Sequence, residues 1–368
     1  MRKKFDPEEM KAVGNYPDYP THFMVGLPPL PPHAKWNKPI TPKENWRLLY
    51  EGKKPYWIPE AGWFNCDVLI FRPRMHPDNA ATHLVFDQEA QMSYDSDVQK
   101  GWFDLDWEWV EIAGGASVHP GNPAVTDINC WEEQVPFPNL DDLDWEAGIA
   151  ANKEYIKTEK MLQAGMLSGF WERLMSLMDV DKAAMAMIDE DQQNGVHRLF
   201  DRLADLYVDY VDRLHQHFNI DSFLIHDDWG TQMNPFFSLD TCREMIVPYL
   251  KRVTDACHER GILFELHSCG KGEKLVPAMI EAGVDLWCPQ IMNNYEELAH
   301  TYKDTRIIFG LTILPPPTDS EEEIRKLAKD FVETYKDCRV ALCDMGAGPV
   351  YTAAIYEYSR KAYENYQD

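Results

Sequence analysis

A carboxylate, an imidazole and a thiol occupy alternate positions of one short segment, at Glu265, His267 and Cys269. An apolar run over residues 261–264 leads into this segment and a glycine follows it, which predicts a buried strand that ends in a loop. Because strand side chains alternate between two faces, the three groups should point the same way. Imidazole and thiolate are ligands that zinc prefers, and a site with an open position uses about three protein ligands. The pattern therefore indicates a zinc site; a core histidine beside an inert cysteine is the alternative interpretation.

Apolar runs alternate with amphipathic helical patterns along the rest of the chain. From residue 145 onward the spacing predicts five or six strand–helix units, and earlier strands are predicted within residues 55–63 and 67–71. Strands that alternate with helices form parallel sheets, and about eight such units form a (β/α)8 barrel. The sequence therefore predicts an α/β protein of the TIM-barrel class. Besides the segment around His267, the later strands are predicted in residues 161–167, 221–226, 284–290, 306–310 and 340–344.

Enzymes with this fold hold their functional groups at the C-terminal ends of the strands. Cys343 lies at such an end and is the favoured third metal ligand, with Cys288 in reserve. Cys338 lies at the opposite end of its strand and is set aside. The predicted substrate-binding residues, all near strand ends, are Trp63, Asp228, Trp229 and Gln290.

Two acidic residues at strand ends are predicted to be catalytic, Asp227 and Glu265, because a positioned carboxyl group can transfer a proton. Asp227 has a second interpretation, in which its side chain caps a helix or holds a loop. Glu265 has one as well, as the hydrogen-bond partner of a metal-bound His267 or as a direct ligand. The acids of residues 104–111 alternate with apolar residues, which is typical of a half-exposed strand with a solvated face.

The composition limits the class of protein. A net charge of −25 argues against nucleic acid as a partner, since such proteins need a basic surface. No run of 18 or more apolar residues predicts a membrane span, and the first residues lack the apolar segment of a signal peptide. Eight cysteines scattered over 368 residues are typical of reduced thiols. We therefore expect a cytoplasmic protein.

Residues 1–50 are rich in proline, with the run GLPPLPP at 26–32. Proline lacks an N–H group and fixes φ, so this composition predicts an extended N-terminal arm instead of a helix. The arm would precede a barrel domain of residues 51–368. It is a candidate contact in a homodimer, and its PxxP pattern also fits a ligand for a proline-binding domain.

Three motifs resemble the uroporphyrinogen decarboxylase superfamily: DDWGTQ (227–232), SLDTCREMIVPYLKRV (238–253) and LHSCGKGEKLVPAMIEAGVDLWCPQ (266–290). The resemblance extends over most of residues 50–366 and implies a (β/α)8 barrel. One branch of this superfamily decarboxylates uroporphyrinogen and grips its carboxylates with the two arginines of an RQAGR-type loop. The corresponding stretch here is PEAGW (59–63), in which Glu60 and Trp63 replace both arginines. An anionic porphyrinogen would meet acidic and aromatic surface, which does not suit it.

A second branch transfers methyl groups with cobamide proteins and binds zinc through an HxC motif and a distant cysteine. This chain is similar to it at HSCG (267–270), which implies zinc at His267, Cys269 and Cys343. The surroundings of Cys343 (LCDMGAG) depart from the usual GC-type turn. The resemblance further implies a corrinoid protein that carries cobalamin, and a small-molecule methyl donor or acceptor. A thiol fits thiol-methylating relatives, whereas a methoxylated aromatic fits the tryptophans near the predicted strand ends. Zinc would act as a Lewis acid.

Three other functions share some of these features. A metal-free decarboxylase or lyase acting on a small acid would use the same strand ends without zinc. A glycosidase would use two carboxylates, such as Glu60 and Asp227, and would not need the thiols. A barrel kept only as a scaffold for a corrinoid protein would not need the His, Cys and acid set at all. The sequence therefore favours the zinc- and corrinoid-dependent methyltransferase, and metal content separates it from the first two.

Overall fold

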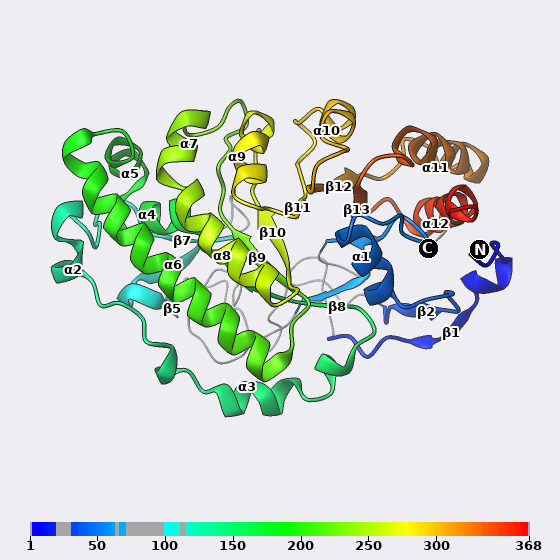
Figure 1. Cartoon of the computed structure of the whole chain (residues 1–368), viewed down its shortest axis with the longest axis horizontal. Helices are drawn as coiled ribbons and strands as arrows, with labels where there is room; N and C mark the ends of the chain where they lie inside the picture. The colour runs from blue at the N-terminus through cyan, green and yellow to red at the C-terminus, as the bar shows by residue number, and fades with distance from the viewer. Residues whose placement is uncertain (1, 20–30, 63–65, 71–98, 111–114, 367–368) are drawn as a thin grey trace.

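The computed structural model describes residues 2–19, 31–62, 66–70, 99–110 and 115–366. Its centre is an eight-stranded sheet in which all paired neighbours run parallel (Figure 1). The strand order is β3-β13-β12-β11-β10-β9-β8-β4, so strands that follow one another along the chain lie side by side. This order confirms the predicted (β/α)8 barrel. The strands are β3 (Glu60–Ala61), β4 (Val68–Ile70), β8 (Met161–Met166), β9 (Ser222–His226), β10 (Leu263–His267), β11 (Leu286–Trp287), β12 (Ile308–Ile313) and β13 (Val340–Asp344).

The segment between β3 and β4 links the two end strands of this sheet. The Asp67 N–H donates to the Glu60 carbonyl over 3.1 Å, and the Asp67 carboxylate accepts from the Glu60 N–H and from the indole of Trp57. The Lys38 ammonium lies 2.9 Å from the same carboxylate. Burial opposes ionisation of Asp67, but Lys38 and these donors lower its pKa. A buried carboxylate with three partners therefore joins the first two strands of the barrel.

Helices follow the strands and pack on the outside of the sheet (Figure 1). The helical segment between β9 and β10 is divided at Ile246, close to Pro248, which has no N–H group to continue the helical hydrogen bonds. The helices after β8 are α4 (Phe170–Met178), α5 (Val180–Ala186) and α6 (Glu190–Phe218). Those after the later strands are α7 (Leu239–Met245), α8 (Val247–Glu259), α9 (Val276–Glu281), α10 (Tyr295–Thr301), α11 (Glu321–Tyr335) and α12 (Pro349–Tyr363).

Helix α6 shows how the sequence produces this outer layer. The Asp189 side chain caps its first turn, and Asn219 ends it in the left-handed conformation with φ 51°. Apolar residues recur every three or four positions, so one face of the helix is apolar and the opposite face is charged. Each fully buried leucine on this face contributes roughly 1.5–3 kcal/mol. The buried stripe comprises Leu199, Leu203, Tyr207, Tyr210 and Leu214.

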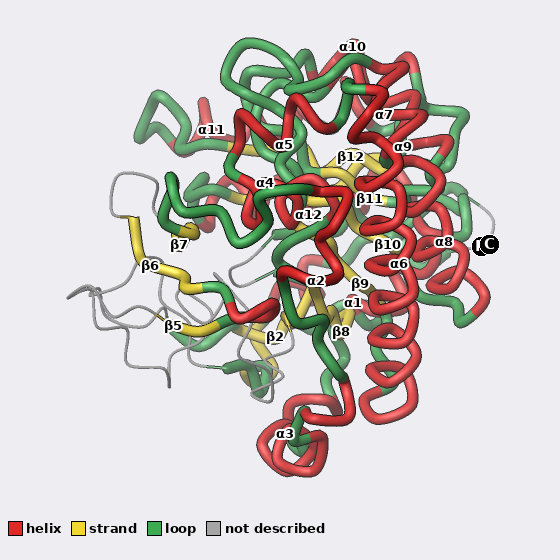
Figure 2. The backbone as a smooth tube through the Cα atoms, turned by 90° about the vertical axis from the view of Figure 1, so that its left-hand side faces the viewer, coloured by secondary structure: helices red, strands yellow, loops and turns green. Residues whose placement is uncertain are grey.

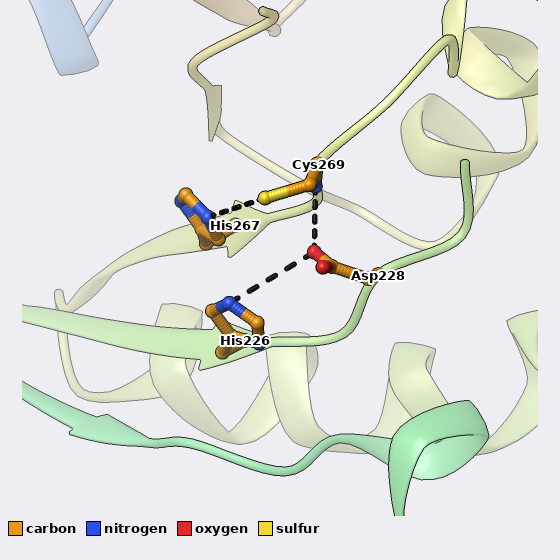
Figure 3. Close-up of side chains that lie close together, drawn as sticks. All are labelled: His226, Asp228, His267 and Cys269. Atoms are coloured by element: carbon orange, nitrogen blue, oxygen red, sulfur yellow. Dashed lines mark hydrogen bonds and ion pairs between the residues drawn. The ribbon is translucent and has the colours of Figure 1, made fainter. Parts of the chain in front are cut away.

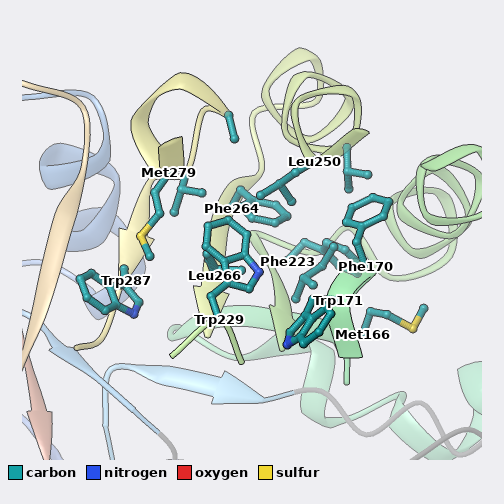
Figure 4. Close-up of a cluster of buried hydrophobic side chains, with 14 of the residues drawn as sticks. Met166, Phe170, Trp171, Phe223, Trp229, Leu250, Phe264, Leu266, Met279 and Trp287 are labelled. Atoms are coloured by element: carbon teal, nitrogen blue, oxygen red, sulfur yellow. The ribbon is translucent and has the colours of Figure 1, made fainter. Parts of the chain in front are cut away.

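The main core fills the space between the sheet and the helices (Figure 4). Phe223 and Phe264 come from neighbouring strands, and Phe170 and Leu250 come from the helices outside them. Trp171 and Trp229 are fully buried in the same cluster. These aromatic residues therefore stabilise the walls of the barrel.

The N-terminal arm contains helical segments where the prediction expected extended chain, a short 3-10 helix at Pro7–Met10 and a longer helix at its end. Residues 42–50 form helix α1 (Pro42–Tyr50), whereas an extended chain was expected throughout. The sequence contains the signal: Thr41 and Glu44 form a capping box, and Pro42 stands in the first turn, where a missing N–H does no harm. The centre of the proline run lies outside the described residues.

The first residues of the arm pack against the last helix. Glu9 is buried and accepts two hydrogen bonds of 2.8 Å from the guanidinium of Arg360 on α12, and a third from the Tyr356 hydroxyl. Figure 1 shows the two chain ends close together on this side of the barrel. The arm therefore contacts its own barrel through a buried ion pair.

A second sheet comes from the long segment between β4 and β8. It consists of β5 (Gln99–Lys100), β6 (Asp106–Val110) and β7 (Gly115–Val118), paired antiparallel, and Figure 2 shows β6 and β7 apart from the barrel strands. The half-exposed strand predicted within 104–111 is confirmed over Asp106–Val110 as β6, with Asp106 exposed and Trp107 buried, whereas Trp102–Asp104 form a 3-10 helix. Among the described residues, no helix combines the length and apolar character needed to cross a bilayer.

Candidate functional site

Two neighbouring strands end in histidines. β9 ends at His226 and β10 at His267, and the parallel register of the two strands places these residues side by side. Their imidazole rings stack, with centroids 4.6 Å apart and an interplanar angle of 21°. Strand pairing therefore brings two nitrogen ligands together at the C-terminal edge of the sheet, where barrel enzymes hold their sites.

Four side chains form what we call the metal-ligand group: His226, Asp228, His267 and Cys269 (Figure 3). One ligand atom from each lies within 4.8 Å of the ligand atoms of the others. The Cys269 sulfur is 3.4 Å from His267 Nε2, and His226 Nε2 is 3.9 Å from Asp228 Oδ1. Two imidazoles, a thiol and a carboxylate are a donor set that zinc accepts in tetrahedral geometry.

The loop after β10 is held in place by its neighbours. The Cys269 N–H donates to Asp228 Oδ1 over 2.6 Å, and the Gly270 N–H donates to the Gln290 side chain over 2.7 Å. Gly270 has φ +80°, and a Cβ there would collide with the backbone of Gly230. The glycine that follows the HxC pattern is therefore required by the close approach of two loops.

Glu172 of α4 orients one of the two histidines. Its carboxylate lies 2.8 Å from His226 Nδ1, and both side chains are largely shielded from solvent. A carboxylate on one ring nitrogen directs the other nitrogen toward a metal and increases its basicity. The sequence reading did not single out Glu172 or His226. Aligning the ends of the two predicted strands would have paired His226 with His267, but only the tertiary structure brings Glu172 to them.

Burial and charge set the protonation of this group. Burial, and then the charge of His226, lower the pKa of His267 to about 3, so its imidazole is neutral and can donate a lone pair. Burial opposes protonation of His226 as well, but Glu172, Cys269 and Asp228 raise its pKa well above the ordinary value. Burial raises the pKa of Glu172 to about 7. The neutral imidazole of His267 thus lies beside the imidazole of His226, which Glu172 and Asp228 flank.

Comparison with known proteins identifies the family of the chain. A model of the uroporphyrinogen decarboxylase (URO-D) family matches residues 149–348, which is more than half of the chain. The chain belongs to the uroporphyrinogen decarboxylase family. The matched range contains the whole metal-ligand group and Glu172. The resemblance seen in the sequence motifs is therefore confirmed at the level of the family.

A solved structure shows the same fold. A methyltransferase from Methanosarcina mazei is 15% identical, with a TM-score of 0.57 over 88% of this chain and 99% of that chain. An intracellular xylanase from Thermoanaerobacterium saccharolyticum (10% identity, TM-score 0.33, 56% of this chain and 72% of its own) is too distant to inform function. An IOLI protein with a bound zinc atom is equally distant, with 10% identity and a TM-score of 0.31 over 58% of this chain and 80% of its own. No curated protein matches the chain.

The hydrogen bonds of Asp227 support its alternative interpretation. Its carboxylate is buried and accepts hydrogen bonds from three N–H groups at the start of α4 and from the indole of Trp229 over 2.9 Å. Burial raises its pKa to about 6 although these donors favour the charged form. With four donors on its two oxygens, Asp227 has the capping role that was its alternative interpretation, and we do not assign it a proton-transfer role.

The structure gives the predicted substrate-binding residues different positions and contacts. Trp229 is fully buried, and its N–H groups donate to Ser268 and Asp227, so it stabilises the loop, and its burial does not support the predicted contact with substrate. Gln290 holds the Gly270 N–H, and Asp228 belongs to the metal-ligand group. Trp63 lies outside the described residues.

Glu265 and Cys343 belong to a different part of the barrel interior. Glu265 accepts a 2.7 Å hydrogen bond from Gln163, and its other oxygen is 3.7 Å from the Cys288 sulfur. Burial raises the pKa of Glu265 to about 7. The Cys288 thiol, in turn, interacts with Cys343 and lowers the pKa of that thiol. Cys343 is thus not part of the metal-ligand group, and the structure supplies His226 and Asp228 in its place.

The reason for this difference is the order of the strands. Cys343 is on β13, and β11 and β12 separate it from β10, which carries His267. His226 is on β9, directly beside β10. Because Cys343 and His226 both lie at strand ends, that position alone could not show which of them lies nearer to His267.

Proposed function

We propose that this chain is a zinc-dependent methyltransferase that moves a methyl group between a small molecule and the cobalamin of a corrinoid protein. The observation that carries the proposal is the metal-ligand group at the C-terminal ends of β9 and β10, in a chain of the uroporphyrinogen decarboxylase family. The fold shared with a methyltransferase supports it. The decarboxylase activity that gives the family its name has no comparable support here, since PEAGW (59–63) lacks the arginines of the RQAGR-type loop.

The donor atoms present fit zinc. His267 is neutral, Cys269 offers sulfur and Asp228 offers a carboxylate oxygen. His226, whose other nitrogen Glu172 holds, would offer Nε2 after zinc displaces its proton. Bound zinc would supply a Lewis acid that polarises the oxygen of a methyl ether or holds a thiol as thiolate. Three of these four residues suffice for a catalytic site, which leaves a position for substrate.

The residues of the chain have separate tasks in this proposal. Asp227 fixes the start of α4, so that Glu172 meets His226. Asp228 holds the Cys269 N–H and thereby the loop that carries the thiol. Glu265 stays a predicted proton carrier, since it is buried two residues before His267 and its pKa is near neutrality.

A corrinoid partner must reach the barrel mouth, and the rim offers it apolar contacts. Large hydrophobic residues are exposed on four of the loops that follow barrel strands, those after β9, β11, β12 and β13. Exposed apolar residues that surround a site favour contact with another macromolecule. The residues are Met233, Phe236, Ile291, Leu314 and Met345.

Metal content tests the zinc site. We expect about one zinc per wild-type chain, with loss of zinc in the variants His226→Ala, His267→Ala and Cys269→Ala. Cys343→Ser is the matched control and should retain zinc, because Cys343 lies outside the metal-ligand group. Loss of zinc from Cys343→Ser with retention in His226→Ala would restore the ligand set implied by the resemblance. A metal-free wild type, purified without chelators, would remove the zinc proposal.

Methyl transfer tests the activity itself. Zinc-loaded protein would be mixed with cob(I)alamin and 1,2-dimethoxybenzene, and formation of methylcobalamin followed by its absorption spectrum. We expect methylcobalamin with the wild type and none with Cys269→Ala. If neither methoxylated aromatics nor, in the reverse direction, thiols with methylcobalamin react, the methyltransferase proposal fails.

A further inference from the structure

Asp179 is the single residue between helices α4 and α5. Its N–H donates to the Met175 carbonyl over 3.0 Å, and its carbonyl accepts from the Ala183 N–H over 2.9 Å, so its backbone belongs to both helices. Its dihedral angles are φ 69° and ψ 151°, a region that is almost confined to glycine. The backbone of Asp179 is therefore strained, and its side chain has to supply something that glycine would not.

The two helices do not account for an aspartate at this position. Among the described residues, its side chain forms no capping hydrogen bond with the first turn of α5. The carboxylate lies between the end of α4 and the start of α5, whose dipoles have opposite effects on a negative charge. The Lys182 ammonium is 3.8 Å away, but this lysine is half exposed and such ion pairs stabilise little. The role of the carboxylate therefore lies outside the two helices.

The carboxylate contacts the segment that is inserted between the second and third barrel strands. The Gly121 N–H donates to Asp179 Oδ1 over 3.1 Å, three residues after the end of β7. Further along the segment, the Val125 N–H donates to the Leu177 carbonyl of α4 over 2.9 Å. The end of α4 is thus joined to the inserted segment at two points, and Asp179 supplies the point nearer to β7.

The residues beside this contact line a pocket of about 290 Å³. Val118 and Pro120 line it from the inserted segment, directly before Gly121, and Asp179 lines it from the helices. Figure 2 shows β7 on the side of the barrel that carries α4 and α5. His226 lines the same pocket and belongs to the metal-ligand group. A small molecule bound here would therefore touch both the inserted segment and a candidate metal ligand.

We propose that Asp179 is a positioning residue, whose carboxylate holds the inserted segment against α4 and α5 and thereby fixes one wall of the substrate pocket. Glycine at this position would relieve the backbone strain but would leave the Gly121 N–H without its acceptor. The proposal rests on the proposed function where it takes the pocket as the substrate site, whereas the contact between Asp179 and Gly121 does not depend on that function.

Three variants separate the strain from the contact. Asp179→Asn keeps an oxygen acceptor for the Gly121 N–H, and asparagine tolerates positive φ better than most residues. Asp179→Ala keeps the strain and removes the acceptor, and Asp179→Gly removes both. We therefore expect the glycine variant to melt about 1–3 °C above the alanine variant, because it releases the strain. Lys182→Ala is the matched control, since it removes the ion pair and leaves the contact with Gly121 intact.

Hydrogen exchange followed by mass spectrometry measures the hold on the inserted segment without any substrate. We expect peptides that cover residues 115–121 to exchange at least about tenfold faster in Asp179→Ala and Asp179→Gly than in the wild type. Asp179→Asn and Lys182→Ala should stay within about threefold of the wild type. Unchanged exchange in both the alanine and the glycine variant would overturn the proposal.

The kinetics of methyl transfer show whether this wall matters to the substrate. With zinc-loaded protein, cob(I)alamin and 1,2-dimethoxybenzene as the probe, Asp179→Ala and Asp179→Gly should raise the KM for the probe at least about fivefold and leave kcat and zinc content within about twofold. Asp179→Asn should restore the wild-type KM. An unchanged KM in the glycine variant would overturn the positioning role. If the wild type transfers no methyl group, the proposed function fails, and the exchange rates alone decide whether Asp179 holds the inserted segment.

Discussion

Replacing Asp227 by asparagine separates a structural role for this residue from a role in proton transfer. The carboxylate accepts hydrogen bonds of 2.8–3.2 Å from the N–H groups of residues 170–172 and from the indole of Trp229. Asparagine has the same size but presents an NH2 group in place of one oxygen. At least one of the four donors therefore loses its acceptor, and the negative charge that strengthens the others is gone.

The size of the effect follows from these contacts. A buried donor without an acceptor costs about 1–3 kcal/mol, and hydrogen bonds to a charged group are about twice as strong as neutral ones. We expect the free energy of unfolding to fall by about 3–5 kcal/mol. An unfolding entropy of about 2.1 cal/mol/K per residue gives about 0.8 kcal/mol/K for a chain of 368 residues. The melting temperature should therefore fall by about 4–6 °C.

Differential scanning calorimetry at pH 8 measures this change, because burial raises the pKa of Asp227 only to about 6 and the carboxyl is ionised at pH 8. The control is Asp240→Asn in α7, whose side chain is 96% exposed and which should leave the melting temperature within about 1 °C. An Asp227→Asn protein with unchanged melting temperature and zinc content, but without methyl transfer, would refute the capping argument and restore the catalytic prediction.

Three further changes test other parts of the structure. Glu172→Gln should weaken zinc binding about 10–100-fold, measured by competition with a chelator, because it removes the carboxylate that orients His226; unchanged affinity would mean that the contact does not matter for the metal. Glu9→Ala leaves the buried guanidinium of Arg360 without its partner and should cost about 3–5 kcal/mol, seen as a lower melting temperature and faster proteolysis of the N-terminal arm. Glu60→Gln tests a pH effect: burial, and then Asp67, raise the Glu60 pKa from 4.5 to about 8. The folded protein keeps a proton there that the unfolded chain releases, so wild-type stability should fall relative to the variant as the pH rises from 4.5 to 8, and parallel curves would contradict this.

Much of the barrel could be predicted because its signals are local. The strand predicted at 221–226 is β9 (Ser222–His226), and that at 340–344 is β13 (Val340–Asp344). Helix α6 follows from the periodic apolar stripe, whose burial needs no knowledge of the partner surface. The exception, α1, carries a capping box that the proline content of its surroundings obscured.

The functional residues are harder to assign from the sequence, because acids and aromatic residues at strand ends have two uses. Asp227 and Trp229 have the residue types of an active site, yet one caps a helix and the other is buried beside it. Whether a carboxylate faces a substrate or a helix terminus depends on where the neighbouring helix begins. That position is set by packing between segments about 55 residues apart, as the contact between Asp227 and Glu172 shows.

The sequence by itself determined that the chain is a (β/α)8 barrel with an imidazole and a thiol, His267 and Cys269, at the end of one strand. Periodicity and spacing encode these features within a few residues of chain. Only the tertiary structure decided which residues complete the group. Parallel pairing of β9 with β10 brings in His226 and Asp228, whereas Cys343 stays with Cys288, because barrel closure fixes the distance between strand ends. Proximity across the barrel is a property of strand order and pairing, which no single segment contains.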